Sequence, residues 1–376
     1  MRVLMTSSAE RDIWQFTSLL VGQLAEHHAA SVLVVVLGRL PAESNIAFLC
    51  HRAHPDATVE VQNLDGPLDN EEHAAADQLA VTRSALRDLA RQWGAQVIHA
   101  NHFSAVAAGF ESIPVLLTAH GDQCSKHSLV DGESPPQVEP GYVEMIRRSL
   151  MTASCVVAPS GFVADCLSRW FGYRGVVRVI PYAATPFPEA MEAERKIDVV
   201  TSGDLWAPST NFVCFQAAAA LAPDLAFAAI GPLVPYGIQR TRPIAHSILF
   251  TGDASKAELN QMLANSKVYV SASTYDPTGV GSIQAALAGC RLLLSDSAFY
   301  RAIWGDRAAY FDARDVDSLL AGIRSLLVGM DMDMETWYTG DGPARRQAIQ
   351  LHSAQHVAAA YLATYQRLAL RNGLVE

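Results

Sequence analysis

Basic residues are few and scattered in this sequence of 376 residues, which has 28 Lys and Arg against 38 Asp and Glu. No run of Lys or Arg stands out, and the net charge is −10. A negatively charged chain without a basic patch is a poor partner for nucleic acid or for an anionic membrane surface. We therefore expect neither partner.

Cysteine is also sparse. The six cysteines lie scattered, without CxxC spacing or paired histidines nearby, which argues against a zinc site and against a disulfide framework. Long apolar runs are lacking too, and Met1–Thr6 enters a strand pattern with no charged-then-apolar leader before it. We expect a cytoplasmic protein with no transmembrane segment.

Hydrophobic residues make up 50% of the chain and charged residues 18%, the balance of a globular protein with a large buried fraction. Short β-branched runs alternate with longer helical patterns, for example the expected helices Ile13–Ala29, Glu71–Trp93 and Ser104–Phe110. This alternation predicts an α/β protein with parallel sheets and crossover helices.

The proline-dense stretch Pro181–Pro188 separates two such patterns and cannot continue a helix or a central strand. We predict an N-terminal Rossmann-like domain over residues 1–185 and a C-terminal one over residues 186–355. The pattern at Arg345–Arg371 predicts one helix, and we expect residues 356–376 to pack back on the first domain. Open α/β sheets bind ligands beyond the carboxyl ends of their strands, so the cleft between the domains is the expected site.

The segment Ser271–Cys290 predicts a strand end, a tight turn and a helix rich in small residues. The first N–H groups of a helix have no partner within it and lie at the positive end of its dipole, so glycines at Gly279 and Gly281 would let an anionic group approach closely. Asp276 and Gln284 would add polar groups for a sugar hydroxyl. An ordinary strand-to-helix turn of an α/β domain fits the same pattern.

Other short segments follow in a fixed order along the chain: His99–Phe103, Leu117–Gly121, Val157–Ser160, Val179–Tyr182, Ile230–Pro232, Phe250–Gly252, Arg301–Gly305 and Ala309–Ala313. Together with the segment Ser271–Cys290, this series resembles the GT-B glycosyltransferases, specifically the retaining group classed as family four. The resemblance implies two doubly wound Rossmann-like domains facing across a cleft. It also implies transfer of a sugar from a nucleoside diphosphate sugar, with retention of anomeric configuration and no metal or other cofactor.

The resemblance further implies roles for single residues. His120 would reach the sugar from the N-terminal domain, and Asp276 would contact the transferred sugar. The N–H groups of Gly279 and Val280 would bind the diphosphate, and Gln284 would hold the ribose hydroxyls. The implied donor-binding set is Gly203, Thr278, Gly279, Val280 and Gln284.

The chain departs from the family where the diphosphate should be neutralised. The family carries an Arg and a Lys at the start of the second domain, whereas this chain has Gly203–Asn211, with Asp204 in the place of the Arg. An acidic side chain there would repel a diphosphate by the Coulomb interaction through which an Arg attracts it. Substitute cations would come from Arg11, Lys126, Arg240, Arg242 or Arg301, although each also suits a solvated surface position.

On the acceptor side, the cleft candidates are Trp14, His102 and Lys126. Trp14 could stack on a sugar ring or pack its own domain. The loop predicted over Asp122–Glu139 follows His120 directly and would select the acceptor, because such loops rim the cleft. The acceptor would be a glycan, a lipid-linked glycan or a small metabolite.

Two other functions remain open at this point. The missing Arg and Lys fit a non-catalytic GT-B-like protein that binds a nucleotide, a glycan or an active partner enzyme. A nucleotide-sugar epimerase would share the architecture, but no added acid/base pair supports it.

Overall fold

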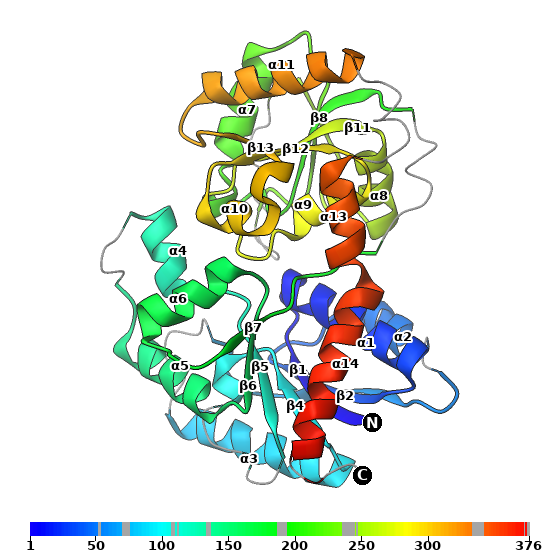
Figure 1. Ribbon diagram of the computed structural model, residues 1–376, viewed down its shortest axis with the longest axis vertical. Coiled ribbons are helices and arrows are strands. Elements are labelled where there is room, and N and C mark those ends of the chain that lie inside the picture. Colours follow the sequence, from blue (N-terminus) through cyan, green and yellow to red (C-terminus); the bar gives the residue numbers. More distant parts are fainter. Residues whose placement is uncertain are drawn as a thin grey trace. The chain divides into compact units, whose positions relative to one another are not determined.

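The computed structural model describes residues 1–51, 54–69, 76–106, 110, 113–132, 137–185, 194–234, 245, 247–332, 342–371 and 373. The chain divides into two compact units. Unit 1 comprises Met1–Ala183 and Ala354–Glu376, and unit 2 comprises Ala184–Ser353. Each unit has a parallel sheet with helices packed on it (Figure 1), which confirms the predicted doubly wound α/β class.

Unit 1 holds a seven-stranded sheet in the order β3-β2-β1-β4-β5-β6-β7, with every neighbouring pair parallel. Its strands are β1 (Arg2–Ser7), β2 (Ser31–Leu37), β3 (Val59–Leu64), β4 (Val97–Ala100), β5 (Val115–Thr118), β6 (Cys155–Ala158) and β7 (Val177–Val179). Its helices are α1 (Arg11–His28), α2 (Glu43–His51), α3 (Ala76–Trp93), α4 (Gln123–Val130), α5 (Pro140–Thr152), α6 (Gly161–Phe171), α14 (Ala354–Arg371) and the 3₁₀ turn η1 (Phe103–Ala105).

Unit 2 holds a six-stranded parallel sheet in the order β10-β9-β8-β11-β12-β13. Its strands are β8 (Ile197–Ser202), β9 (Phe227–Ile230), β10 (Ile248–Phe250), β11 (Ser266–Ser271), β12 (Arg291–Ser295) and β13 (Ala309–Phe311). Its helices are α7 (Phe212–Leu221), α8 (Lys256–Ala264), α9 (Val280–Leu287), α10 (Ala298–Trp304), α11 (Val316–Met332), α13 (Pro343–His352) and the 3₁₀ turns η3 (Pro208–Thr210) and η4 (Gly305–Arg307).

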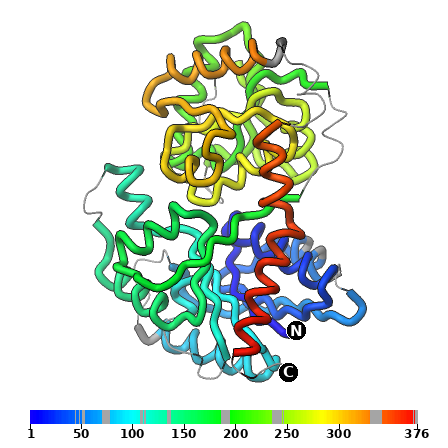
Figure 2. The backbone as a smooth tube through the Cα atoms, in the orientation of Figure 1, coloured from blue at the N-terminus to red at the C-terminus, as the bar shows by residue number. Residues whose placement is uncertain are grey.

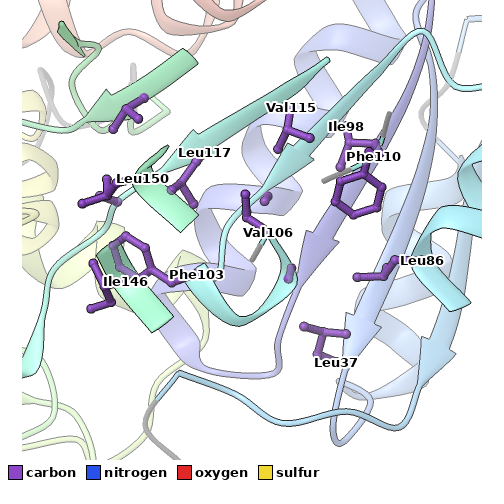
Figure 3. Close-up of a cluster of buried hydrophobic side chains, with 14 of the residues drawn as sticks. Leu37, Leu86, Ile98, Phe103, Val106, Phe110, Val115, Leu117, Ile146 and Leu150 are labelled. Carbon is purple, nitrogen blue, oxygen red and sulfur yellow. The ribbon is translucent and has the colours of Figure 1, made fainter. Parts of the chain in front are cut away.

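The apolar core of unit 1 lies between its sheet and the helices that cover it. Leu117 of β5 lies near Leu150 of α5, Phe103 lies beside Ile146 of α5, and Val115 of β5 lies near Ile98 of β4 (Figure 3). These side chains are almost fully buried. Burial of each such large apolar side chain contributes on the order of 2 kcal/mol, and this packing fixes the carboxyl ends of β4 and β5.

Helix α14 belongs to unit 1 although it comes last in the sequence. It packs against α1 and β4, and its far end lies at the same end of unit 1 as the start of β1 (Figure 2). The prediction of a single helix over Arg345–Arg371 is wrong, because the structure has two helices there, α13 and α14, which are separated at Ser353. There Ser353 forms a β-bridge with Ala184, and the Ala184 N–H donates to the carbonyl of His352 (3.0 Å).

Two other local predictions need correction. The loop expected over Asp122–Glu139 contains the helix α4, because Asp122 caps it by accepting from the Ser125 N–H (2.7 Å) and the Ser125 hydroxyl (2.6 Å). The expected helix Ser104–Phe110 begins as the 3₁₀ turn η1, and residues 107–109 lie outside the described residues. Among the described helices, none is long and apolar enough to cross a membrane.

Candidate functional site

The turn that leads from β11 into α9 lies at the carboxyl edge of the unit 2 sheet. Gly279 is the N-cap residue of α9, has φ +63° and provides no side chain to cap the helix. A Cβ at Gly279 would lie 2.6 Å from Ile303 Cδ1, so both the backbone conformation and the packing require glycine here. An α-helix that begins without a capping side chain leaves its first N–H groups to an external anion, here from Val280 onward.

Asp276 holds this turn in place. Its Oδ1 accepts from the Gly279 N–H (2.9 Å) and lies 3.3 Å from the Thr278 hydroxyl, and its Oδ2 accepts from the Tyr300 hydroxyl (2.8 Å). Burial raises the pKa of the Asp276 carboxyl, while these hydrogen bonds act in the opposite direction. The Gly279 N–H, expected on a diphosphate, is thus bonded to a carboxylate of the same turn.

Tyr300 and Trp304 of α10 bond this segment, Tyr300 to the turn and Trp304 to α9. Both side chains are fully buried. The Tyr300 hydroxyl also lies 2.6 Å from Ser271 Oγ, at the end of β11. The Trp304 indole N–H donates to Ser282 Oγ in the first turn of α9 (2.8 Å). Sequence reasoning noted the segment Arg301–Gly305 but missed Tyr300, which precedes it.

Glycines also let the neighbouring elements approach one another. A Cβ at Gly281 would lie 2.4 Å from the Tyr269 hydroxyl, and a Cβ at Gly231 would lie 1.8 Å from the Gly203 carbonyl oxygen. Gly203 directly follows β8, with φ +131°, and β8 pairs with β11. The structure therefore brings Gly203 to the same sheet edge as the α9 turn, and Gln284 lies half-buried on α9 itself.

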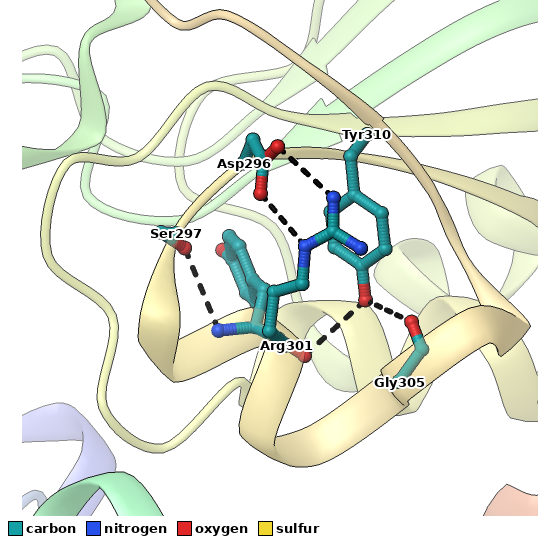
Figure 4. A network of polar contacts seen from close by, with 6 residues as sticks. Asp296, Ser297, Arg301, Gly305 and Tyr310 are labelled. Carbon is teal, nitrogen blue, oxygen red and sulfur yellow. Dashed lines mark hydrogen bonds and ion pairs between the residues drawn. The ribbon is translucent and has the colours of Figure 1, made fainter.

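The substitute cations lie in different settings. Arg301 is bound to Asp296 through two hydrogen bonds (2.7 and 2.9 Å), and its guanidinium lies 4.0 Å from the centre of the Tyr310 ring (Figure 4). Lys126 is exposed on α4, and Arg11 is exposed at the start of α1. The other two candidates, Arg240 and Arg242, lie outside the described residues.

In unit 1, His120 follows β5 and is held at both ring nitrogens. Nε2 lies 3.0 Å from Asn101 Oδ1, and Nδ1 lies within hydrogen-bond distance of the Tyr182 hydroxyl. Asn101 Nδ2 donates to the backbone oxygen of Thr6 (2.7 Å), so Asn101 Oδ1 faces the histidine and the proton belongs on His120 Nε2. Burial lowers the pKa of His120 well below its usual value, with His102 and His99 adding to the effect. His120 is a neutral imidazole with a fixed tautomer.

His99 in β4 is a second histidine of unit 1 that is held at both ring nitrogens. His99 Nδ1 contacts the Tyr365 hydroxyl (2.6 Å), and Nε2 contacts the Thr118 hydroxyl (2.8 Å). Burial lowers the pKa of His99 to about 3. Phe16 packs edge-on against both histidines, with ring centroids 6.0 Å from His99 and 5.0 Å from His120. Helix α14, which supplies Tyr365, thus supports the His120 region.

His102 and Trp14 are buried in unit 1. His102 is 3% exposed, and neither of its ring nitrogens has a hydrogen-bond partner within the described part of the chain. Burial lowers the pKa of His102, while Asp69 and Glu10 act to raise it. Trp14 is 9% exposed and packs within its own unit, the second of the two environments considered for it. Among the described residues, no group of three or more His, Cys, Asp or Glu is placed to hold a metal ion.

Comparison with known proteins shows what this chain is similar to. A family model described as Glycosyltransferase Family 4 matches residues 23–184. Glycogen synthase of Mycobacterium tuberculosis is 24% identical over 364 residues, which cover 87% of this chain and 86% of that protein. This chain is a glycosyltransferase, and it is similar to family four over residues 23–184.

Solved structures share the fold of this glycosyltransferase over nearly its whole length. Sucrose-phosphate synthase from Thermosynechococcus elongatus superposes with a TM-score of 0.76 at 16% identity, covering 99% of this chain and 100% of that one. HepE of Anabaena in complex with UDP-glucose superposes with a TM-score of 0.72 at 15% identity, covering 98% of this chain and 100% of that one. These likenesses confirm the predicted GT-B fold.

Proposed function

We propose that this glycosyltransferase moves a sugar from a nucleoside diphosphate sugar to an acceptor, with retention of anomeric configuration and without a metal ion. The observation that carries the proposal is the uncapped first turn of α9, held open at the carboxyl edge of the unit 2 sheet by Asp276 and Tyr300. HepE, a protein of the same fold, has been solved with UDP and with UDP-glucose, which supports a nucleotide-sugar donor.

The described residues of unit 2 would bind the donor mainly through the backbone. N–H groups from Val280 onward would donate to the diphosphate, which needs positive potential most when it departs with the bonding electrons. Gln284, half-buried one turn further along α9, would meet the ribose hydroxyls. Asp276 would act as a positioning residue, because its oxygens are already engaged by Gly279, Thr278 and Tyr300.

His120 would serve the sugar from unit 1. It is neutral, so it would not add a full positive charge next to the oxocarbenium-like sugar of the transition state, and its Nε2–H would be available if the bond to Asn101 were exchanged for one to the substrate. Tyr182 would hold the ring from Nδ1 throughout. Acceptor contacts are proposed for His102 and for Lys126 on α4, and Trp14 would support them from the core.

The test is a titration followed by a transfer assay. Calorimetry with UDP, GDP, ADP and their glucose or mannose conjugates identifies the base and the sugar, with a nucleoside monophosphate as the control for the diphosphate contacts. Transfer to a panel of glycan and small-molecule acceptors is then followed by NMR of the anomeric proton. We expect an α-linked product from an α-linked donor, at a rate that EDTA does not change. An inverted product would refute retention.

A second function rests on a specific observation. Asp204 occupies the position at which the family carries an Arg, and the substitute cation Arg301 is paired with Asp296. An acidic group beside a poorly neutralised diphosphate costs affinity, which favours a non-catalytic protein that binds a nucleotide, a glycan or a partner enzyme. Tight nucleotide binding without turnover over the same panels would support this function, and binding with turnover would exclude it.

A further inference from the structure

The loop Ala272–Thr274 follows β11 and leads into the turn before α9. Both of its ends are bonded to the segment that follows β8. The Thr274 N–H donates to the carbonyl oxygen of Ser209 (2.8 Å), and the Ala272 carbonyl oxygen accepts from Asn211 Nδ2 (3.3 Å). The segment after β8 therefore helps to fix the place from which the α9 turn starts.

Asn211 has a backbone conformation that favours glycine. Its φ is +51° and its ψ is +42°, in the left-handed region. It is the N-cap residue of α7, a position at which asparagine is among the best capping residues. Its side chain nevertheless forms no hydrogen bond to the first N–H groups of that helix, so the amide group is used elsewhere.

The amide group of Asn211 joins two other loops. Nδ2 carries two hydrogens, and it donates to the carbonyl oxygen of Ala313, after β13 (2.9 Å), and to that of Ala272, after β11 (3.3 Å). The Asn211 N–H donates to the carbonyl oxygen of Pro208 (3.1 Å), at the start of the turn η3. One residue thus holds together the segments that follow β8, β11 and β13 at the carboxyl edge of the unit 2 sheet.

Other bonds of these segments support the same arrangement. The Thr210 hydroxyl donates to the Asp204 carbonyl oxygen (2.9 Å), so the segment after β8 is folded on itself. The Ser295 hydroxyl, at the end of β12, donates to the Ser273 carbonyl oxygen (2.6 Å). Every residue of the loop Ala272–Thr274 is therefore bonded to a neighbouring segment.

We propose that Asn211 is a positioning residue of the donor site, because it holds the loop from which the α9 turn starts. This inference rests on the proposed function, in which N–H groups from Val280 onward bind the diphosphate. Donors on the main chain cannot adjust their positions one by one, as a flexible Lys or Arg side chain can, so such a site requires a fixed loop. The stretch Gly203–Asn211, in which the family carries its Arg and Lys, then serves the diphosphate through its contacts instead of its charge.

The test compares two variants at Asn211 with one control. Asn211→Gly accepts the positive φ and removes both amide bonds. Asn211→Asp keeps the shape of the side chain but places carboxylate oxygens, which cannot donate, against two carbonyl oxygens. The control is Arg195→Ala, since Arg195 also donates to two carbonyl oxygens of unit 2. Those belong to Ser266, at the start of β11, and to Ala288, just after α9.

Each full-length protein is titrated with UDP, GDP and ADP by calorimetry, and its hydrogen exchange is followed at the Thr274 and Gly279 amides. Thermal melting shows which variants fold, and Asn211→Gly decides if Asn211→Asp does not. We expect both Asn211 variants to exchange about tenfold faster at these amides and to bind the nucleoside diphosphate about tenfold more weakly. Arg195→Ala should lower the melting temperature but leave the exchange at both amides and the Kd unchanged.

Unchanged exchange at both amides in the Asn211 variants would overturn the proposal. An equal loss of affinity in Arg195→Ala would do the same, because it would indicate a general loss of stability. Two further outcomes separate this proposal from the proposed function. If the wild type binds none of the three nucleotides, the donor site itself fails and this role of Asn211 fails with it. If the wild type binds one of them and the Asn211 variants bind it equally well, only the role of Asn211 fails.

Discussion

The six strands of the unit 2 sheet follow the same order as the first six of unit 1, yet the carboxyl edges of the two sheets present different chemistry. Unit 2 presents main chain, in the form of the uncapped start of α9 with glycines at Gly279 and Gly281. Unit 1 presents side chains, namely two neutral histidines: the half-buried His120, bonded to Tyr182, and the buried His99, bonded to Tyr365. Binding through the backbone N–H groups of α9 should tolerate most side-chain substitutions outside the turn. The hydrogen bonds around His120 and His99 depend on each side chain that forms them. The following variants test that difference.

The largest effect is expected at His120. Removing its ring in His120→Ala should lower kcat by about 10²- to 10³-fold, because a group aimed at developing charge contributes mainly in the transition state. The KM for the donor should stay within about threefold of wild type. Steady-state kinetics with the donor identified by titration measures both quantities. Tyr182→Phe is the matched variant: it keeps the aromatic ring, loses the bond to Nδ1 and should reduce kcat by only about tenfold. A loss confined to KM in His120→Ala would remove His120 from catalysis.

His99 in unit 1 and Asp276 in unit 2 should make the stability of their units change with pH in opposite directions. His99 has a folded pKa of about 3 and an unfolded pKa near 6.5. A lowered pKa contributes stability that is present above pH 6.5 and is lost as the pH falls toward 3. Between pH 7 and pH 5, His99 alone should cost unit 1 about 2 kcal/mol. Asp276 in unit 2 has a raised pKa, so its contribution has the opposite sign and is lost as the pH rises through the folded pKa.

Hydrogen exchange at pH 7 and pH 5 measures this difference, read at the β4 and β5 amides for unit 1 and at the β11 amides for unit 2. His99→Gln provides the control, because glutamine does not titrate in this range. The acid-induced loss of exchange protection at the β4 amides should be smaller in that variant. An equal loss in wild type and variant would show that His99 does not cause it.

A smaller effect is expected at Tyr300, which tests the backbone turn of unit 2. Tyr300→Phe leaves Asp276 Oδ2 without its donor and should cost about 1–2 kcal/mol of unfolding free energy. Nucleotide affinity should fall with it, since Asp276 holds the turn that begins α9. Tyr310→Phe is the control, because its hydroxyl bonds the backbone carbonyls of Gly305 (2.7 Å) and Tyr300 (3.5 Å) rather than Asp276. Equal loss of affinity in both variants would contradict a special role for the turn.

The smallest effect is expected at Gln284. A carboxylate can accept hydrogen bonds from both ribose hydroxyls, whereas an amide offers one acceptor and one donor. Gln284→Glu should therefore tighten nucleoside diphosphate binding by about 1 kcal/mol, measured by calorimetry. Weaker binding would show that Asp204 and the missing cations dominate, because a further negative charge then repels the diphosphate. If no nucleotide binds either protein, the donor site is not functional.

Much of the fold was predictable because its signals are local. Alternating strand and helix patterns indicated parallel α/β sheets, and the ordered series of short segments indicated GT-B. Predictions were less accurate where one contact decides the local structure. Asp122 converts part of the expected loop into α4 through a cap, and the bridge between Ala184 and Ser353 breaks the last helix in two.

The candidate site shows the same division. The groups that follow the strand ends, including His120, Gly203 and the turn before α9, could be predicted from the sequence, because a strand pattern and the residues after it are neighbours in the chain. What those groups contact depends on how the chain folds. Tyr182 meets His120 across 62 residues and Tyr300 meets Asp276 across 24, because strand order and helix packing place them together. Those contacts determine whether each group is charged and whether it is available to a substrate.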